Sequence, residues 1–192
     1  DVEALGRRSI CVGGDVTSPE SCAETVAETL KAFGRIDILV NNAGITRDDL
    51  AMRMTDQAWA DVLNVNLTGS FYMARAVLRP MLKQRSGRII NMSSVSGQMG
   101  NAGQANYSAS KAGLIGLTKA RIAELFEAAG LDVKAAKLRA KQVFHWLYHR
   151  GVTEFEAMTD IAKTMRPWLT ERFVIGRPEV VLAQHSSDGT RK

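Results

Sequence analysis

The chain has 192 residues, of which 45% are hydrophobic and 23% charged, proportions that are ordinary for a globular protein and exclude a wholly disordered chain. No run of about 18 apolar residues occurs, so the sequence predicts no membrane-spanning helix. The formal net charge of +5 is compatible with an acidic partner, either nucleic acid or protein, but it is also common in soluble enzymes.

The N-terminal residues and the two cysteines bear on the cellular compartment. The chain opens on Asp-Val-Glu, with neither a basic region nor an apolar stretch, so no signal peptide is predicted, and the lack of an initiator Met indicates that the start is missing. Cys11 and Cys22 cannot build a metal motif alone, and a disulfide is not expected in a cytosolic protein. We expect a cytoplasmic protein with small, buried or half-buried cysteines.

Strand-like and helix-like segments alternate in the first part of the chain. The short apolar run Ser9–Gly13 predicts a buried parallel strand. A helix is predicted over 18–33, because Ser18 is a preferred N-cap residue and Pro19 fits the first helical position. The next apolar run, Ile36–Val40, predicts a second strand that ends in a turn.

The alternation continues to residue 119. A long helix is predicted over 55–83, a third strand over 87–92, a loop rich in Ser and Gly over 93–103, and a further helix over 104–119. The order is β-α-β-α-β-α, which implies an α/β fold with parallel strands and right-handed crossovers.

Beyond residue 120 the patterns are mostly helical, which predicts a small, mostly helical domain. Helices are expected over 122–129, 133–149, 153–158 and 159–172, followed by a strand entry over 173–181 and a hairpin turn over 186–192.

Four polar residues carry the chemistry of the first part. Tyr107 and Lys111 are four apart and share one helix face, and a cation beside a phenol, whose pKa is ordinarily about 10, favours the phenolate. Ser94 precedes Tyr107 by thirteen residues, at a strand end where its hydroxyl can bind a carbonyl oxygen. Asn66, in the long helix, can hold a water that links Lys111 to solvent. Each residue alone is ordinary, and only the four together indicate catalysis.

These four residues and the turn Asn41–Gly44 resemble the short-chain dehydrogenase/reductase family. The segments Asn41–Asp49 and Asn101–Leu117 are similar to those of the bacterial 3-oxoacyl-[acyl-carrier-protein] reductases, and the resemblance covers residues 1–119. It implies NADPH-dependent reduction of a 3-oxoacyl thioester, carried on acyl carrier protein, to the 3-hydroxyacyl product.

The resemblance also implies roles for individual residues. Tyr107 is the expected general acid, Lys111 its pKa partner and nicotinamide-ribose ligand, Ser94 the carbonyl binder and Asn66 the relay. The family's chains pair through the helices at 55–83 and 104–119, which implies a homo-oligomer. The residues implied outside the catalytic set are Asp15, Asn42, Ala43 and Gly44 beside the adenosine half of the cofactor, and Arg85 against the acidic carrier protein.

The sequence departs from the family in its cofactor site. The family opens with a strand and a glycine-rich turn, T-G-x-x-x-G-x-G, where the pyrophosphate sits at a helix N-terminus, and nothing here matches it. The first two strands of the family's sheet and the elements after Lys119, its last strand and substrate loop included, are therefore expected to be missing. We expect an incomplete Rossmann-like sheet with unpaired edges between the Ser9–Gly13 strand and the Ile36–Val40 strand.

The segment 124–192 resembles a different family. The text Leu138–Gly151, with Phe155, Met158 and the tail Asp188–Lys192, is similar to the N-terminal region of the bacterial dual-specificity RNA methyltransferases of the radical-SAM type. That family needs three cysteines for an iron–sulfur cluster, and this segment has none, so neither a cluster nor methyl transfer is expected.

The second segment also has features of an RNA-contacting module. From Ala120 it holds twelve Lys or Arg against nine Asp or Glu, and basic side chains flank several aromatic ones. The alternative is that Phe144, Leu147 and Tyr148 form the core face of a helix, which we favour for the aromatics. His145 and His149 lack a third ligand, so no metal site is predicted. The aromatics are Phe144, Trp146 and Tyr148, and the flanking cations are Arg139, Lys141 and Arg150.

The sequence thus predicts two truncated pieces, a partial reductase domain over 1–119 and a partial helical domain over 121–192. The expected function is the NADPH-dependent reduction, impaired by the missing strands. The alternative function is an RNA-binding accessory module without catalysis, carried by 121–192.

Overall fold

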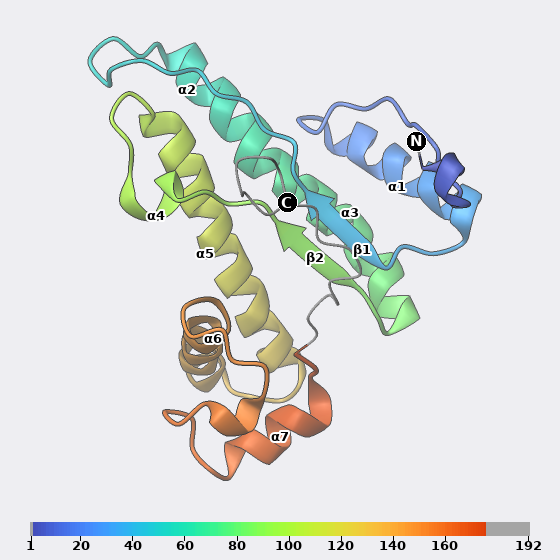
Figure 1. The fold of residues 1–192 in the computed structure, drawn as a ribbon, viewed down its shortest axis with the longest axis vertical. Helices are drawn as coiled ribbons and strands as arrows, with labels where there is room; N and C mark the ends of the chain where they lie inside the picture. Colours follow the sequence, from blue (N-terminus) through green and yellow to red (C-terminus); the bar gives the residue numbers. More distant parts are fainter. Residues whose placement is uncertain (1, 176–192) are drawn as a thin grey trace. The chain divides into compact units, whose positions relative to one another are not determined.

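The computed structural model describes residues 2–175, which fall into two compact units (Figure 1). The first unit ends at Thr118 and the second begins at Lys119. The boundary lies inside helix α5 (Ala105–Ala128). The helices predicted over 104–119 and 122–129 are therefore one continuous helix, because no Gly or Pro interrupts the stretch between them.

The sheet of the first unit contains two parallel strands among the described residues, β1 (Ile38–Asn41) and β2 (Arg88–Asn91), paired in register from Ile38 with Arg88 to Asn41 with Asn91. The predicted strand at Ser9–Gly13 is wrong: these residues form no strand and are mostly exposed. An apolar run becomes a strand only where a neighbouring backbone accepts its hydrogen bonds, and none does so here.

Helix α1 (Pro19–Phe33) confirms its predicted start and end. The Ser18 hydroxyl accepts a hydrogen bond from the Ser21 backbone N–H at 3.1 Å, and Gly34 closes the helix with a φ of 79°. A short 3-10 turn, Glu3–Leu5, precedes this helix.

The long helix predicted over 55–83 forms as three consecutive segments, α2 (Asp56–Leu63), a π-helical turn (Asn64–Thr68) and α3 (Gly69–Gln84). Thr55 caps its start by accepting a hydrogen bond from the Ala58 backbone N–H at 3.1 Å. The π-helical turn adds one residue to a helical turn, and such turns are frequent at functional sites.

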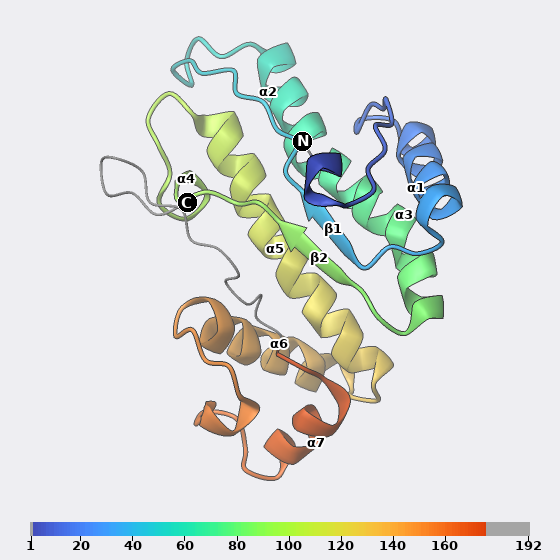
Figure 2. The same ribbon diagram turned by 45° about the vertical axis from the view of Figure 1, so that its right-hand side comes forward.

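Helices α1 and α3 pack side by side against one face of the sheet, as both ribbon views show (Figure 2). The core on this face contains Leu39 and Ile89 from the strands together with Val26, Ile36, Val77 and Met81. A short helix, α4 (Ser96–Met99), interrupts the loop predicted over 93–103.

The second unit packs the end of α5 against α6 (Val133–Tyr148), a 3-10 turn (Phe155–Ala157) and α7 (Met165–Arg172). The helix predicted over 153–158 is only that turn, and the one over 159–172 begins at Met165. The guanidinium of Arg166 explains this, because it donates hydrogen bonds to the backbone carbonyls of Glu156, Thr159 and Ile161 and holds the segment as a loop.

The expected strand entry over 173–181 does not begin in the described residues, because Phe173–Ile175 form no strand, and 176–181 lie outside them. The hairpin turn expected over 186–192 also lies outside. None of the helices in the described range is both long and apolar enough to cross a membrane.

Candidate active site

A cavity of about 340 Å³ lies where the two parallel strands end. Its walls come from the turn after β1, from the residues after β2, and from α5. Ligands of open parallel sheets bind at this carboxyl edge of the strands. The residues that line the cavity are Asn42, Gly44, Ile45, Thr46, Met92, Ser93, Tyr107 and Lys111.

Lys111 is buried at this cavity, with 5% of its surface exposed. Its ammonium donates a hydrogen bond of 2.7 Å to the carbonyl oxygen of Met92 and lies 5.6 Å from the centre of the Tyr107 ring. Burial lowers the pKa of the Lys111 amine, because the charged form loses its hydration. The predicted pairing of Tyr107 and Lys111 on one helix face is therefore present.

The start of α5 is fixed by Asn106, a residue that the sequence analysis did not single out. Asn106 is fully buried; its side-chain N–H groups donate to the carbonyls of Arg47 at 2.9 Å and Ala58 at 3.1 Å, and its side-chain oxygen accepts from the Tyr107 backbone N–H at 2.7 Å. These bonds tie the first turn of α5 to the segment after β1. In the sequence, only its polar side chain directly before Tyr107 could have pointed to Asn106.

Asn66 lies in the π-helical turn and is fully buried. Its side-chain oxygen accepts a hydrogen bond from the Ile45 backbone N–H at 2.8 Å, and its amide nitrogen donates to the Ile45 carbonyl at 3.0 Å and the Ser110 hydroxyl at 3.1 Å. Both N–H donors of the amide are thus used by protein groups. Asn66 ties the turn after β1 to α5.

Ser94 is not among the residues that line this cavity, and its expected role as carbonyl binder stays a prediction. Its hydroxyl accepts a hydrogen bond from the Ser96 backbone N–H at 3.2 Å, as part of the turn that opens α4. The neighbouring Ser93 lines the cavity among the described residues, and its hydroxyl donates to the Lys111 carbonyl at 2.9 Å. The structure therefore brings Tyr107, Lys111, Asn42 and Gly44 to one cavity, with Ser93 in the lining position at the end of β2.

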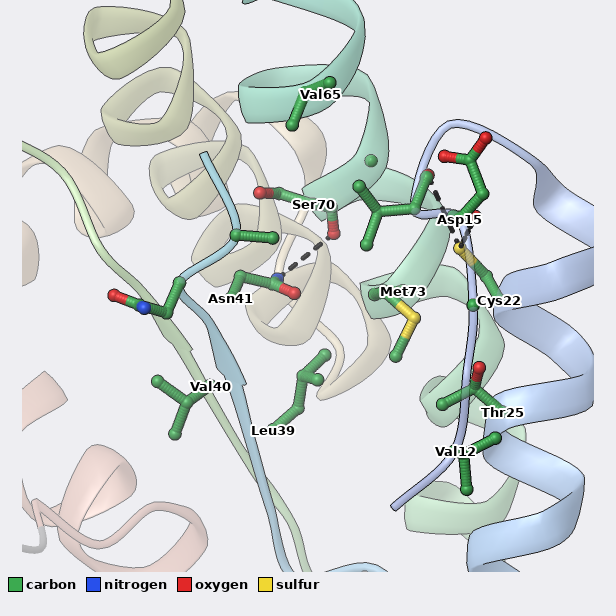
Figure 3. A pocket seen from close by; sticks show the side chains of 15 residues that line it. Val12, Asp15, Cys22, Thr25, Leu39, Val40, Asn41, Val65, Ser70 and Met73 are labelled. Atoms are coloured by element: carbon green, nitrogen blue, oxygen red, sulfur yellow. Dashed lines mark hydrogen bonds between the residues drawn. The ribbon is translucent and has the colours of Figure 1, made fainter. Parts of the chain in front are cut away.

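A second cavity, of about 200 Å³, lies on the other side of β1 (Figure 3). One wall is the segment from Val12 to Val16 and the other is β1 with the following Asn42 and Ala43. Of the residues expected near adenosine, Asp15, Asn42 and Ala43 line this cavity, whereas Gly44 lines the first one. The Asp15 carboxylate accepts hydrogen bonds from the Thr17 backbone N–H and hydroxyl, both at 2.8 Å, and these bonds lower the pKa of Asp15.

The two cysteines differ in exposure. Cys22 is buried beside this second cavity, and burial raises the pKa of its thiol. Cys11 is exposed, so the expectation of a buried or half-buried side chain is wrong for it. The apolar run around Cys11 lacks the strand neighbours that would cover it.

Arg85, the residue expected to contact the carrier protein, is exposed just after α3. Its backbone has a φ of 53°, a left-handed conformation that is uncommon for residues other than glycine. Its exposed side chain lies at the end of α3 and lines neither of the two cavities.

In the second unit, α6 carries four cations, Lys134, Lys137, Arg139 and Lys141, and no acidic residue. Phe144 is buried in this helix and stacks on Tyr148, which is 64% exposed. The indole N–H of Trp146 donates to the Asp160 carboxylate. The core interpretation of the aromatics thus holds for Phe144 and not for Tyr148. The described residues contain no group of three side chains that could hold a metal.

Comparison with known proteins identifies both segments. The family described as short chain dehydrogenase matches residues 1–138, and the family described as ribosomal RNA large subunit methyltransferase N-terminal domain matches residues 112–175. The matches overlap from α5 into α6. The resemblances found in the sequence, to a reductase and then to an RNA methyltransferase N-terminal region, are confirmed.

Individual relatives give the same division. The chain is 56% identical over 111 residues to the 3-oxoacyl-[acyl-carrier-protein] reductase FabG of Vibrio cholerae, which covers 58% of this chain and 46% of the relative. It is 50% identical over 135 residues to the 3-oxoacyl-[acyl-carrier-protein] reductase of Synechocystis sp., covering 70% of this chain and 54% of the relative.

The other segment is 82% identical over 79 residues to the dual-specificity RNA methyltransferase RlmN of Novosphingobium aromaticivorans, covering 41% of this chain and 18% of that protein. The chain thus spans about half the length of the reductases and about a fifth of the methyltransferase. The match at residues 1–138 covers more than half of the chain, and its parallel strands with a Tyr-x-x-x-Lys helix agree with that match: the chain belongs to the short chain dehydrogenase family.

Proposed function

We propose that the first unit carries the proton-transfer half of a reductase active site, which acts on 3-oxoacyl groups carried by acyl carrier protein. The observation that carries the proposal is the buried Lys111 ammonium beside the Tyr107 ring, at a cavity where two parallel strands end. The substrate class rests on the reductases of Vibrio cholerae and Synechocystis sp., which are similar over this segment.

In this proposal Tyr107 donates its hydroxyl proton to the carbonyl oxygen of the substrate. The phenolate left behind is stabilised by the nearby Lys111 ammonium, whose hydrogen bond to Met92 fixes its position. Asn106 and Asn66 act as positioning residues, because they tie the Tyr107 turn and the turn after β1 together. NADPH, when bound, would supply the hydride to the carbonyl carbon.

The residues present fit only part of that cofactor. Asn42, Gly44 and Lys111 line a cavity of a size suited to the nicotinamide end. Residues 1–192 contain no glycine-rich turn for the pyrophosphate, and α1 offers no substitute, because the Ser18 hydroxyl already caps its first turn and Glu20 places a carboxylate there. We therefore propose weak NADPH binding through the nicotinamide end and correspondingly impaired catalysis.

The test is reduction of acetoacetyl-acyl-carrier-protein by the purified chain at high NADPH concentration, followed by the loss of NADPH absorbance. Slow turnover that Tyr107→Phe abolishes, and that Tyr72→Phe on α3 leaves unchanged, would support the proposal. Turnover that survives Tyr107→Phe, or no turnover at all, would refute it for this chain. Titration with NADPH alone should show no saturation in the low micromolar range.

A second candidate function is RNA contact through the second unit. It is favoured by the four cations of α6, which meet no acidic residue on their own helix, and by the exposed Tyr148. It also draws on the similarity to the RNA methyltransferase of Novosphingobium aromaticivorans. The second unit would then act as an accessory RNA-binding module without catalysis.

Binding of a labelled RNA hairpin at several salt concentrations tests this candidate. The double variant Lys137→Ala with Lys141→Ala should weaken binding and lower the salt dependence by about one counterion per lysine, whereas Lys163→Ala in an exposed loop should change neither. Equal effects of the two sets would show that the α6 face is not the contact.

A further inference from the structure

Lys111 differs from the other lysines of residues 2–175 in its surroundings. It is buried, with 5% of its surface exposed, whereas every other lysine in this range is exposed. Water stabilises the charged form of an exposed lysine, whereas burial favours the neutral amine, and burial lowers the pKa of Lys111 accordingly. A desolvated lysine amine is a nucleophile toward carbonyl compounds, so Lys111 is the lysine of this range best suited to that reaction.

No negative charge holds Lys111 in its ammonium form. The residues that line its cavity include no Asp or Glu, and within residues 2–175 no carboxylate forms an ion pair with Lys111. A nearby carboxylate would have favoured the ammonium. The acceptor of the Lys111 hydrogen bond is instead the neutral carbonyl of Met92, 2.7 Å away. A neutral amine can keep this bond with one N–H and still offer its lone pair to the cavity.

The same cavity supplies an acid and room for a small carbonyl compound. The centre of the Tyr107 ring lies 5.6 Å from the Lys111 nitrogen, so a carbonyl group bound between them can meet the amine at its carbon and the phenol at its oxygen. The cavity volume of about 340 Å³ is at the lower end of the range for small-molecule pockets. Asn42 and Thr46 add an amide and a hydroxyl group to the wall, and these can bind a second oxygen atom.

We propose that Lys111 is a covalent binding site for small 1,3-dicarbonyl compounds. The neutral amine attacks one carbonyl carbon, the carbonyl oxygen takes the Tyr107 proton, and the new ammonium returns a proton to the phenolate. Tyr107 then protonates the hydroxyl group, the C–O bond breaks, water leaves, and the nitrogen lone pair completes the C=N bond. Finally the phenolate takes a proton from the carbon between the two carbonyl positions, which leaves a neutral enaminone on Lys111. The sum is amine plus diketone giving enaminone plus water, with no oxidant or reductant.

The second carbonyl group decides the class of ligand. The imine of a simple ketone is readily hydrolysed, whereas an enaminone is conjugated with its remaining carbonyl group and persists in water. That remaining oxygen is also the atom that Asn42 and Thr46 can bind. The reaction uses neither NADPH nor hydride transfer, so the inference goes beyond the proposed reductase function and does not rest on it.

The experiment incubates the full chain with pentane-2,4-dione in a mildly alkaline buffer without NADPH. The enaminone is followed by its ultraviolet absorbance and is located by tryptic mass spectrometry, because trypsin does not cleave after a modified lysine. The adduct should form at Lys111 at least about tenfold faster than at any other lysine. Urea should abolish this preference, because unfolding exposes every lysine to water.

Two pairs of variants test the residues named in the proposal. Lys111→Met should lose the fast phase of absorbance, whereas Lys83→Met, which removes an exposed lysine, should keep it. Tyr107→Phe should slow the reaction of Lys111 by about tenfold or more through loss of the acid, whereas Tyr72→Phe on α3 should leave the rate unchanged.

Three results would overturn the proposal. They are equal rates at all lysines of the folded parent chain, a fast phase that survives Lys111→Met, and an unchanged rate in Tyr107→Phe. The mass spectra of the parent chain decide the first of these even if a variant does not fold. None of these results bears on the reductase proposal, because neither NADPH nor a thioester is present.

Discussion

Lys111 is held where its charge is costly. Its side chain is buried at the active-site cavity, and the hydrogen bond to the Met92 carbonyl replaces only part of the hydration of an ammonium group. In the proposed reaction the same placement is useful, because a poorly hydrated cation acts strongly on the Tyr107 ring 5.6 Å away. Burial of the Lys111 ammonium therefore both lowers the stability of the fold and strengthens the proposed effect of this cation on Tyr107.

The cost of Lys111 can be measured as a dependence of stability on pH. Burial lowers the pKa of the folded-state amine below its ordinary value of 10.5, so the folded chain releases this proton at a lower pH than the unfolded chain does. The free energy of unfolding therefore gains a contribution as the pH rises from the lowered pKa to 10.5. Urea denaturation should show this gain in the parent chain and not in Lys111→Met.

The control for that measurement is Lys83→Met, which removes an exposed lysine at the end of α3 and should keep the gain. If the two variants change the pH dependence equally, the Lys111 ammonium is hydrated in solution and the proposed cost of its burial is refuted.

Arg85 shows backbone strain at a single residue. Its φ of 53° places an arginine in a conformation that glycine adopts freely, which costs an L-residue about 1 kcal/mol. Arg85→Gly should therefore raise the free energy of unfolding by up to about 1 kcal/mol in urea denaturation. Lys83→Gly, two residues earlier within α3, should lower it by about 1 kcal/mol. Destabilisation by both glycines would show that the Arg85 side chain makes a stabilising contact in solution.

At the scale of elements, the π-helical turn Asn64–Thr68 holds the buried Asn66 side-chain amide within hydrogen-bond distance of three groups. They are the Ile45 backbone N–H, the Ile45 carbonyl and the Ser110 hydroxyl. Asn66→Ala would remove the partners of the Ile45 backbone N–H and of the Ser110 hydroxyl. We expect a loss of about 1–3 kcal/mol in the free energy of unfolding, measured with urea. Asn64→Ala, at an exposed position in the same turn, should change it by no more than about 0.5 kcal/mol.

A loss below about 0.5 kcal/mol for Asn66→Ala would contradict this account of the turn. It would mean that water replaces the Asn66 amide, and the positioning role proposed for Asn66 would fail with it.

The sequence correctly predicted the features that depend only on residues close to one another in the chain. The Ser18-Pro19 start of α1 and the Thr55 cap of α2 depend on neighbouring residues, and the pairing of Tyr107 with Lys111 depends on helix geometry alone. The predicted strand at Ser9–Gly13 failed because a strand depends on a distant neighbour that its own residues do not encode.

Two features of the site depend on tertiary contacts in the same way. Ser93 and Ser94 are adjacent at a strand end, and only the packing of α4 and α5 decides which of them lines the cavity. Asn106 matters because of carbonyl groups some fifty residues earlier in the chain. No local pattern carries such information.

At the scale of the whole molecule, one helix crosses the boundary between the two units. The α5 helix continues across the boundary at Thr118 and Lys119, although the described parts of the two units have separate buried clusters. Helical continuity requires only good local propensity, so it does not show that the two clusters fold together. We propose that the units unfold independently.

Matched substitutions in the two clusters test that proposal. Met81 lies in the cluster of the first unit and Met158 in that of the second, and both are buried, at 7% and 0% exposed. Each Met→Ala change should cost its own cluster about 2–5 kcal/mol through lost burial and a residual cavity. Followed by hydrogen–deuterium exchange, Met81→Ala should accelerate exchange in α3 and leave α6 unchanged, and Met158→Ala should do the reverse. Because the two substitutions are chemically identical, any difference between the exchange patterns reports where the cooperative units end. If either substitution accelerates exchange in both helices to the same extent, the chain unfolds as one cooperative body and the two segments depend on each other for stability.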